Sequence, residues 1–160
     1  MSPVLTESDF SHPSFLGVEF HSWPLRSRLG ACKIIDHQWS PNSHYYYCED
    51  GIYVNLFKNS GGNIINNFIM YIDIGDEDYF NVGYTGKLPF RLSSEANIND
   101  VCTRLGKPVA SFEKVVDSLI GYEHASISYN YSHDRFVNFS YEDSGAVVSV
   151  CIGLRYQKES

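Results

Sequence analysis

The sequence has no long apolar run, few charged residues and no cysteine pair at metal-binding spacing. Only 19% of its 160 residues are charged, and its longest apolar stretch, residues 64–72, is broken by Asn66 and Asn67. A membrane-spanning helix needs about 20 consecutive apolar residues. The four cysteines form no CxxC pair, and no basic and apolar leader opens the chain. These absences predict a soluble protein of the reducing cytoplasm, with free thiols.

Motifs that usually carry catalysis or bind a cofactor are also missing. There is no HxH, HExxH or GxSxG pattern. Gly61 and Gly62 do not precede a helical pattern, which excludes a phosphate loop. Asp73, Asp76 and Asp78 invite a calcium interpretation, but their spacing does not fit an EF-hand loop. We therefore expect a protein that is not an enzyme and that holds no cofactor and no metal.

Aromatic residues and negative charge are abundant instead. The chain has 12 Tyr and 10 Phe, 43% hydrophobic residues and a net charge of −7. This composition excludes disorder and disfavours nucleic acid as a partner, whereas a basic protein would be attracted. Tyrosine is favoured at protein interfaces because it joins an apolar ring to a polar tip. The plainer interpretation of any single tyrosine is that it covers a sheet edge.

The first half of the chain predicts a short helix followed by an antiparallel meander. Residues 1–20 show no clear period and are expected to be irregular. Residues 22–30 begin with an N-cap serine and end with glycine, which is typical of a helix of about two turns. Strands are expected at residues 45–48, 52–57 and 64–72, because these segments are rich in strand-forming residues and are separated by turn residues.

The second half repeats this order. Asn97 and Asp100 predict the start of a helix, and Gly106 and Pro108 predict its end. Residues 112–120 are open between a loop and a further helical turn. Strands are expected at residues 125–131, 135–141 and 146–154.

Apolar periodicity predicts which face of each element is buried. Ile98, Val101, Cys102 and Leu105 share one face of the second helix. The strand residues expected on buried faces are Ile52, Val54, Leu56, Val137, Phe139, Tyr141, Val148, Val150, Ile152 and Leu154. Cys102 and Cys151 are interpreted as small apolar fillers.

The two halves are weakly similar to each other. Short matches relate residues 28–30 to 104–106, 53–55 to 136–138, and 64–65 to 147–148. Because such matches arise easily by chance, the shared order of elements carries the hypothesis. The sequence predicts an α+β fold over residues 1–160 as a single domain. Two helix-plus-three-stranded antiparallel meander units, at 20–75 and 95–155, would join into one sheet-rich domain.

The second unit resembles a repeat found in two bacterial groups. These are the small outer-membrane assembly lipoproteins and the secreted β-lactamase inhibitor proteins, which carry the unit twice. The likeness rests on Leu105, Gly106, Lys107 and Pro108, followed by the closing strands. The first half departs from the pattern, since Cys32 stands where the proline belongs.

Residues 51–154 also resemble small immunity proteins of bacterial toxin systems, including pyocin-type ones. The features that carry this likeness are the hairpin at 52–72, residues 86–89, residues 100–108 and the closing hairpin. The resemblance implies a cytoplasmic inhibitor that binds a cognate toxin, and a basic nuclease would suit the acidic chain. A non-catalytic assembly or scaffolding module is the alternative. A small-molecule or enzymatic role would need a pocket that the sequence does not locate.

Two clusters of acidic and aromatic residues are the candidate partner-binding sites. One comprises Asp76, Glu77, Asp78 and Tyr79, and the other comprises Glu49 and Asp50 beside Tyr45, Tyr46 and Tyr47. Carboxylates there would face a basic toxin and speed its association. The plainer alternative is that both are solvated turns. Neither nucleic acid nor a membrane is expected as a partner.

Overall fold

A computed structural model describes residues 16–17, 32–36, 43–48, 51–59, 62–73, 83–84, 88–93, 95–117, 119, 121–132 and 134–154. Its elements are β1 (Cys32–Asp36), β2 (Ser43–Cys48), β3 (Ile52–Asn59), β4 (Gly62–Tyr71), η3 (Pro89–Arg91), α1 (Ile98–Leu105), β5 (Ala110–Phe112), β6 (Val115–Asp117), β7 (Gly121–Glu123), β8 (Ala125–Ser132), β9 (Arg135–Tyr141) and β10 (Val147–Leu154). The six strands expected from the sequence are confirmed as β2, β3, β4, β8, β9 and β10, within two residues at each end.

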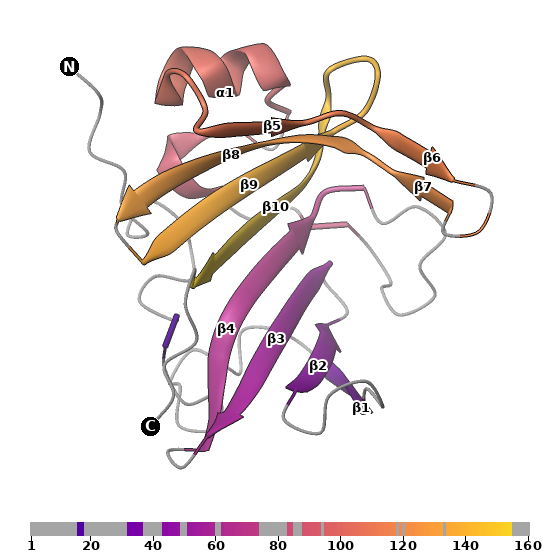
Figure 1. Cartoon of the computed structure of the whole chain (residues 1–160), viewed down its shortest axis with the longest axis vertical. Helices are drawn as coiled ribbons and strands as arrows, with labels where there is room; N and C mark the ends of the chain where they lie inside the picture. The colour runs from indigo at the N-terminus through magenta and orange to yellow at the C-terminus, as the bar shows by residue number, and fades with distance from the viewer. Residues whose placement is uncertain are drawn as a thin grey trace.

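The main sheet is antiparallel and eight-stranded, in the order β1-β2-β3-β4-β10-β9-β8-β5. Figure 1 shows its two halves, with β1 to β4 in indigo to magenta and β5 and β8 to β10 in orange to yellow. The halves meet where β4 pairs with β10, through Phe68 opposite Ile152 and Ile69 opposite Cys151. The prediction of a sheet-rich α+β fold with antiparallel strands is therefore confirmed.

The turn into β3 is fixed by a close backbone approach at Gly51. The residue has a φ of 82°, and a Cβ there would lie 2.5 Å from the backbone nitrogen of Tyr84. The Tyr71 N–H donates to the Gly51 carbonyl at 2.8 Å, and the Tyr84 N–H donates to the Tyr71 carbonyl at 2.7 Å. Only glycine combines this left-handed conformation with the space available.

The helix predicted from Asn97 and Asp100 is confirmed as α1. The Asn97 side chain accepts from the Asp100 N–H, and the Asp100 carboxylate accepts from the Asn97 N–H, both at 3.0 Å. This reciprocal pair is a capping box, which satisfies two amides that the first helical turn leaves unbonded. Gly106 ends the helix with a φ of 85°, as the sequence predicts.

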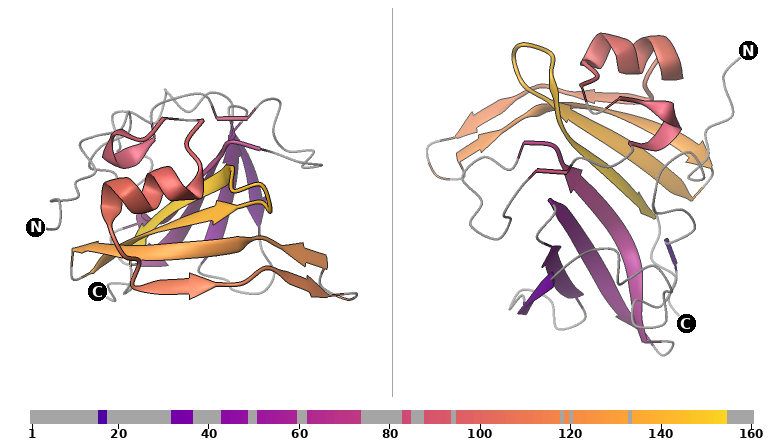
Figure 2. Two further views of the ribbon diagram at one scale, coloured as in Figure 1. Left: turned by 90° about the horizontal axis from the view of Figure 1, so that it is seen from above. Right: turned by 180° about the vertical axis from the view of Figure 1, so that it is seen from behind.

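α1 packs on the β8–β10 half of the sheet (Figures 1 and 2). Val101 and Leu105 are buried in the core and Ile98 packs against it. The Tyr129 hydroxyl on β8 donates to the Gly106 carbonyl at 2.8 Å, and Cys102 Sγ lies 3.7 Å from the same hydroxyl. Cys102 is exposed, so the prediction that it fills the core is wrong. It lies at the rim of the buried face of the helix, where solvent still reaches it.

The core lies between one face of the sheet and the segments that cover that face. Ile52, Val54 and Leu56 are fully buried there, as the alternation in β3 predicts. Phe68 and Phe139 are among the largest side chains with no solvent contact, and Phe139 meets Tyr129 edge-on at 6.2 Å. The apolar area removed from water here is the main stabilising contribution to the fold.

A bulge in β10 corrects one predicted face. Val147 lies opposite Tyr141 and Ser149 lies opposite Ser140, which leaves Val148 as an extra residue. Val147 therefore joins Val150 and Ile152 in the core cluster, whereas Val148 is buried outside it. The sequence places Val148 on the core face because strict alternation assumes an unbroken strand.

Strands β1, β5, β6 and β7 are missing from the sequence prediction. Of residues 112–120, left open between loop and helix, Phe112 ends β5 and Val115–Asp117 form β6. Their apolar residues are exposed rather than alternating with polar ones, so no period signals a strand.

The two predicted units can be located only in part. β2 to β4 and β8 to β10 form the two expected meanders, and α1 precedes the second. The expected helix at 22–30 lies outside the described residues, as does nearly all of the expected irregular segment 1–20. Across the described ranges, no helix is long and apolar enough to cross a membrane.

Candidate protein-binding surface

All of the acidic residues predicted to bind a partner, and one of the tyrosines, lie outside the described part of the chain. This holds for Asp76, Glu77, Asp78, Tyr79, Glu49 and Asp50. Tyr45, Tyr46 and Tyr47 lie in β2, where Tyr45 is opposite Asn55 and Tyr47 is opposite Tyr53. Tyr46 is opposite the core residue Val54, so the three tyrosines do not occupy positions on one face.

The sheet face opposite the core is the most extensive candidate surface that the structure describes. Three cross-strand rows from β3, β4, β10, β9 and β8 form this outer face. The rows are Tyr53, Ile69, Cys151, Asn138 and Ser128; Asn55, Asn67, Gly153, Phe136 and Asn130; and Tyr71, Ser149, Ser140 and Ser126. None of these residues is charged. Tyr45 and Tyr47 hold register positions that extend two of the rows.

Hydrogen bonds order the β8–β9 part of the outer face. The Asn138 amide donates to the hydroxyl oxygens of Ser128 at 2.8 Å and Ser126 at 3.2 Å. Next to Asn138, burial raises the pKa of the Cys151 thiol to about 12. The thiol is therefore neutral at physiological pH, and this part of the surface is polar without charge.

An aromatic ring lies against the middle of the outer face at Gly153. A Cβ at this glycine would come within 2.8 Å of the Phe136 ring and 3.0 Å of Asn67 Cβ. The Asn67 Oδ1 atom is buried and has no hydrogen-bond partner in the described structure. An aromatic ring packed across a glycine on the neighbouring strand helps to fix the register of a sheet.

Two hollows open on the outer face near the β5 edge. The larger, of about 780 Å³, is lined by outer-face residues and by the bend between β5 and β6, including Phe112, Lys114, Val115, Ser126, Asn138 and Ser149. The second, of about 490 Å³, is lined by Val109, Ala110, Phe112, Ser128, Asn130 and Phe136. Phe112 lines both hollows. Side chains of a partner could enter them on either side of this ring.

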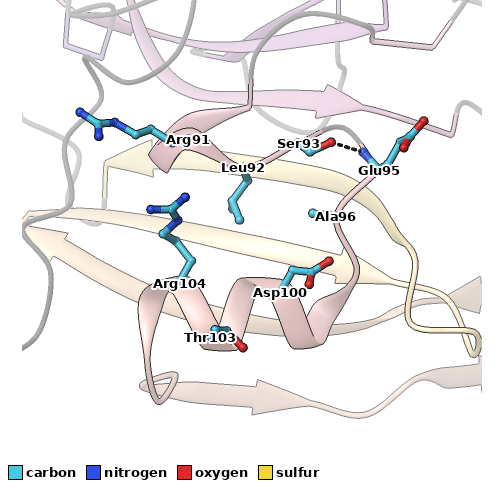
Figure 3. A pocket seen from close by; sticks show the side chains of 8 residues that line it. All are labelled: Arg91, Leu92, Ser93, Glu95, Ala96, Asp100, Thr103 and Arg104. Carbon is cyan, nitrogen blue, oxygen red and sulfur yellow. Dashed lines mark hydrogen bonds between the residues drawn. The ribbon is translucent and has the colours of Figure 1, made fainter.

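A third hollow, of about 620 Å³, lies on the opposite side of the sheet beside α1. Figure 3 shows Arg91 and Arg104 at one end of it, and Glu95 and Asp100 toward the other. Phe90 and Arg91 both have a φ of 62°, a strained conformation for residues with side chains. Buried Phe90 meets Tyr131 edge-on at 5.6 Å, which holds the strained turn in place.

Within the described ranges, no group of three His, Cys, Asp or Glu side chains is placed to hold a metal ion. Comparison of the chain with protein-family models, with curated proteins and with solved structures finds no match. The surface itself therefore carries the functional argument.

The sequence contained part of the signal for the outer face. Small polar residues alternate with apolar ones in β8 and β9, which is typical of strands with one buried face. The rows themselves depend on strand order and register. β4 and β10 are far apart in the sequence, so their pairing could not be read from either strand alone.

Proposed function

We propose that this protein is an immunity protein that binds and neutralises a cognate bacterial toxin through the outer face of its sheet. The observation that carries the proposal is the set of charge-free cross-strand rows, rich in Tyr, Asn and Ser, with two adjoining hollows. Ser126 and Ser128 of these rows are buried. The larger hollow also has Glu113, Lys114 and Glu123 in its lining. Interface cores in proteins are depleted of charge and enriched in aromatic residues. The earlier resemblance to toxin-system immunity proteins supports the same function.

The net charge of −7 gives this surface an acidic setting. Since the rows of the outer face carry no charge, the acidic residues lie elsewhere on the chain. Charges outside an interface core mainly raise the rate of association and select partners of opposite sign. A basic toxin, such as a nuclease that must hold phosphates, is the partner that this arrangement suits. The acidic clusters at 49–50 and 76–78 remain candidates for the rim.

Two copies of one meander unit would account for the breadth of the outer face. The strand order is the same when read from either edge, with β1 to β4 matching β5, β8, β9 and β10. The two central strands each have a bulge, at Asn66 in β4 and at Val148 in β10. A further bulge at Tyr131 in β8 has no counterpart in the pairing of β2 with β3. Ile69 and Cys151 lie opposite each other where the two halves meet. The bulge at Asn66 is three residues before Ile69, and the bulge at Val148 is three residues before Cys151. Matched bulges at matched positions support an internal duplication.

This correspondence revises the alignment of the two halves. In the first half, Val54 lies opposite Phe68, which is two residues after the bulge at Asn66. In the second half, Phe139 lies opposite Val150, which is two residues after the bulge at Val148. Val54 therefore corresponds to Phe139, rather than to Val137 as the match of residues 53–55 with 136–138 suggests. The two hairpins differ in loop length, which short sequence matches cannot detect.

Placing a charge on the outer face tests the proposal. Ser140→Arg puts a cation on the half-buried β9 row, and Thr103→Arg puts one on the exposed surface of α1 as a control. The probe is the purified product of the reading frame immediately upstream, with affinity measured by calorimetry. We expect tight binding by wild type and by Thr103→Arg, and at least about tenfold weaker binding by Ser140→Arg.

Growth of cells that co-express the two proteins provides the functional measurement. Wild type should restore growth, and Ser140→Arg should protect less. No binding or protection by the wild-type chain would overturn the immunity function. Equal binding by all three proteins would instead remove the outer face from the interface. Micromolar binding to several unrelated proteins would favour the scaffolding alternative.

A further inference from the structure

The strands β6 and β7 form a small arm with an unusual surface. They pair only with each other in a two-stranded sheet, which extends from β5 and β8 away from the main sheet (Figures 1 and 2). We call residues 112–123 the β6–β7 arm. An isolated two-stranded hairpin is marginally stable in water, so the arm gains little from its own pairing.

Exposed apolar residues concentrate on this arm. Phe112 is 56% exposed, Val115 49%, Val116 73% and Leu119 95%. In the described ranges, Val109, just before β5, is the only other large hydrophobic residue with comparable exposure. A contiguous apolar cluster on a projecting element marks an interaction site, whereas scattered exposed apolar residues would not.

Each face of β6 has an exposed valine. Val115 and Val116 are neighbours in β6, and successive side chains in a strand point to opposite faces. Leu119 lies between the two strands at the tip. A flat partner would cover one face and leave the other valine in water. A cleft would enclose both faces and the tip, so this distribution favours a concave occupant.

The base of the arm is braced against the sheet. Lys114 Nζ lies 2.8 Å from Asp143 Oδ2 and 3.1 Å from Asp143 Oδ1, and Asp143 belongs to the turn between β9 and β10. The ion pair is exposed and contributes little to stability, and it links the start of the arm to the turn between β9 and β10. A braced arm loses less conformational freedom on binding than a loose one.

The charges of the arm select the occupant. Residues 112–123 contain three acidic residues, Glu113, Asp117 and Glu123, and one basic residue, Lys114. Lys114 forms an ion pair with Asp143. This acidic surround disfavours an anionic bilayer and a second copy of the same acidic chain. It suits a protein cleft with an apolar floor and basic residues at its rim.

We propose that the β6–β7 arm inserts Val116 and Leu119 into an apolar, basic-rimmed cleft of the toxin while the outer face contacts the surface beside that cleft. This inference rests on the proposed function and assigns the arm to the same interface. The larger outer-face hollow lies at the bend where the arm begins, so the two surfaces are continuous.

A pair of double variants tests the arm without touching the core. Val116→Ser with Leu119→Ser removes the apolar surface, and Val116→Ile with Leu119→Met retains it. The purified product of the upstream reading frame is the probe, and calorimetry gives the affinity. We expect at least about tenfold weaker binding for the serine pair and near wild-type affinity for the Ile and Met pair. Both should keep the wild-type circular dichroism spectrum and melting temperature.

The outcomes separate the arm from the function on which it rests. If wild type binds tightly and the serine pair binds with the same affinity, the arm is not part of the interface, and the proposed immunity function is unaffected. No binding by wild type overturns both. Sedimentation of the wild type alone is the second measurement. A dimer that becomes monomeric in the serine pair would assign the arm to a second copy and overturn the proposal, as would arm-dependent binding to anionic vesicles.

Discussion

At the scale of single residues, two cysteines in different surroundings are expected to react differently. Cys102 is exposed on α1, whereas burial raises the pKa of Cys151 to about 12. The thiolate is the reactive form, and at pH 8 roughly one Cys151 thiol in 10⁴ is ionised. Iodoacetamide at pH 8 should therefore label Cys102 long before Cys151, as peptide mass spectrometry of a time course can show. Equal labelling rates in the native protein would contradict the burial of Cys151.

Gly153 is the residue at which the outer face tolerates least change. An added Cβ would lie 2.8 Å from the Phe136 ring. Gly153→Ala should therefore lower the free energy of unfolding by about 1–3 kcal/mol, the usual cost of overpacking. Urea denaturation measures the loss, and Phe136→Val in the same chain should restore part of it. If the alanine variant is as stable as wild type, the ring does not lie on this glycine.

At the scale of elements, a hydrogen bond from β8 holds the C-terminal end of α1. Tyr129→Phe removes the 2.8 Å bond to the Gly106 carbonyl and should cost about 1 kcal/mol at pH 7.

Burial, followed by the contact with Cys102, raises the pKa of Tyr129 above its ordinary value near 10. An acid whose pKa is raised by folding stabilises the fold below its unfolded pKa, and this contribution is lost as the pH rises through the folded value. Wild type should thus lose stability steeply above about pH 10, and Tyr129→Phe should lose less over the same range. Urea titrations from pH 7 to 11 give both slopes, and parallel slopes would contradict the assignment.

The cap of α1 is a second test at this scale. Asn97→Ala removes an acceptor for the Asp100 N–H and should destabilise the protein by about 1 kcal/mol. Asn97→Ser keeps a capping oxygen and serves as the control. Thermal melting of both variants measures the difference, and equal melting temperatures would show that the cap does not stabilise the helix.

At the scale of the whole molecule, the core runs continuously across the junction of β4 and β10. Phe68 lies in β4 opposite Ile152 in β10, and both are fully buried. Phe68→Ala should cost about 3–5 kcal/mol and destabilise both halves of the sheet together. Tyrosine fluorescence and circular dichroism should then follow a single transition in denaturant. Two separated transitions would indicate that the halves unfold independently.

The sequence by itself determined the local elements. Asn97, Asp100 and Gly106 fix the ends of α1 through bonds that span only a few residues, and the alternation of Ile52, Val54 and Leu56 fixes the buried face of β3. These features depend on neighbours in the chain, so capping chemistry and a period of two are enough to predict them. The exposed arm escaped prediction because its apolar residues lack a buried face to alternate against.

Only the tertiary structure decided which surfaces come together. Asn67 and Gly153 are distant in sequence, yet the pairing of β4 with β10 makes them neighbours on the outer face. The bulge at Val148 then puts Val147, in place of Val148, on the same face as Val150 and Ile152. Strand order and register arise from long-range burial of apolar side chains, and a shift of one residue exchanges the two faces of a strand. The candidate binding surface therefore follows from the packing of the whole sheet, which no single segment of the sequence specifies.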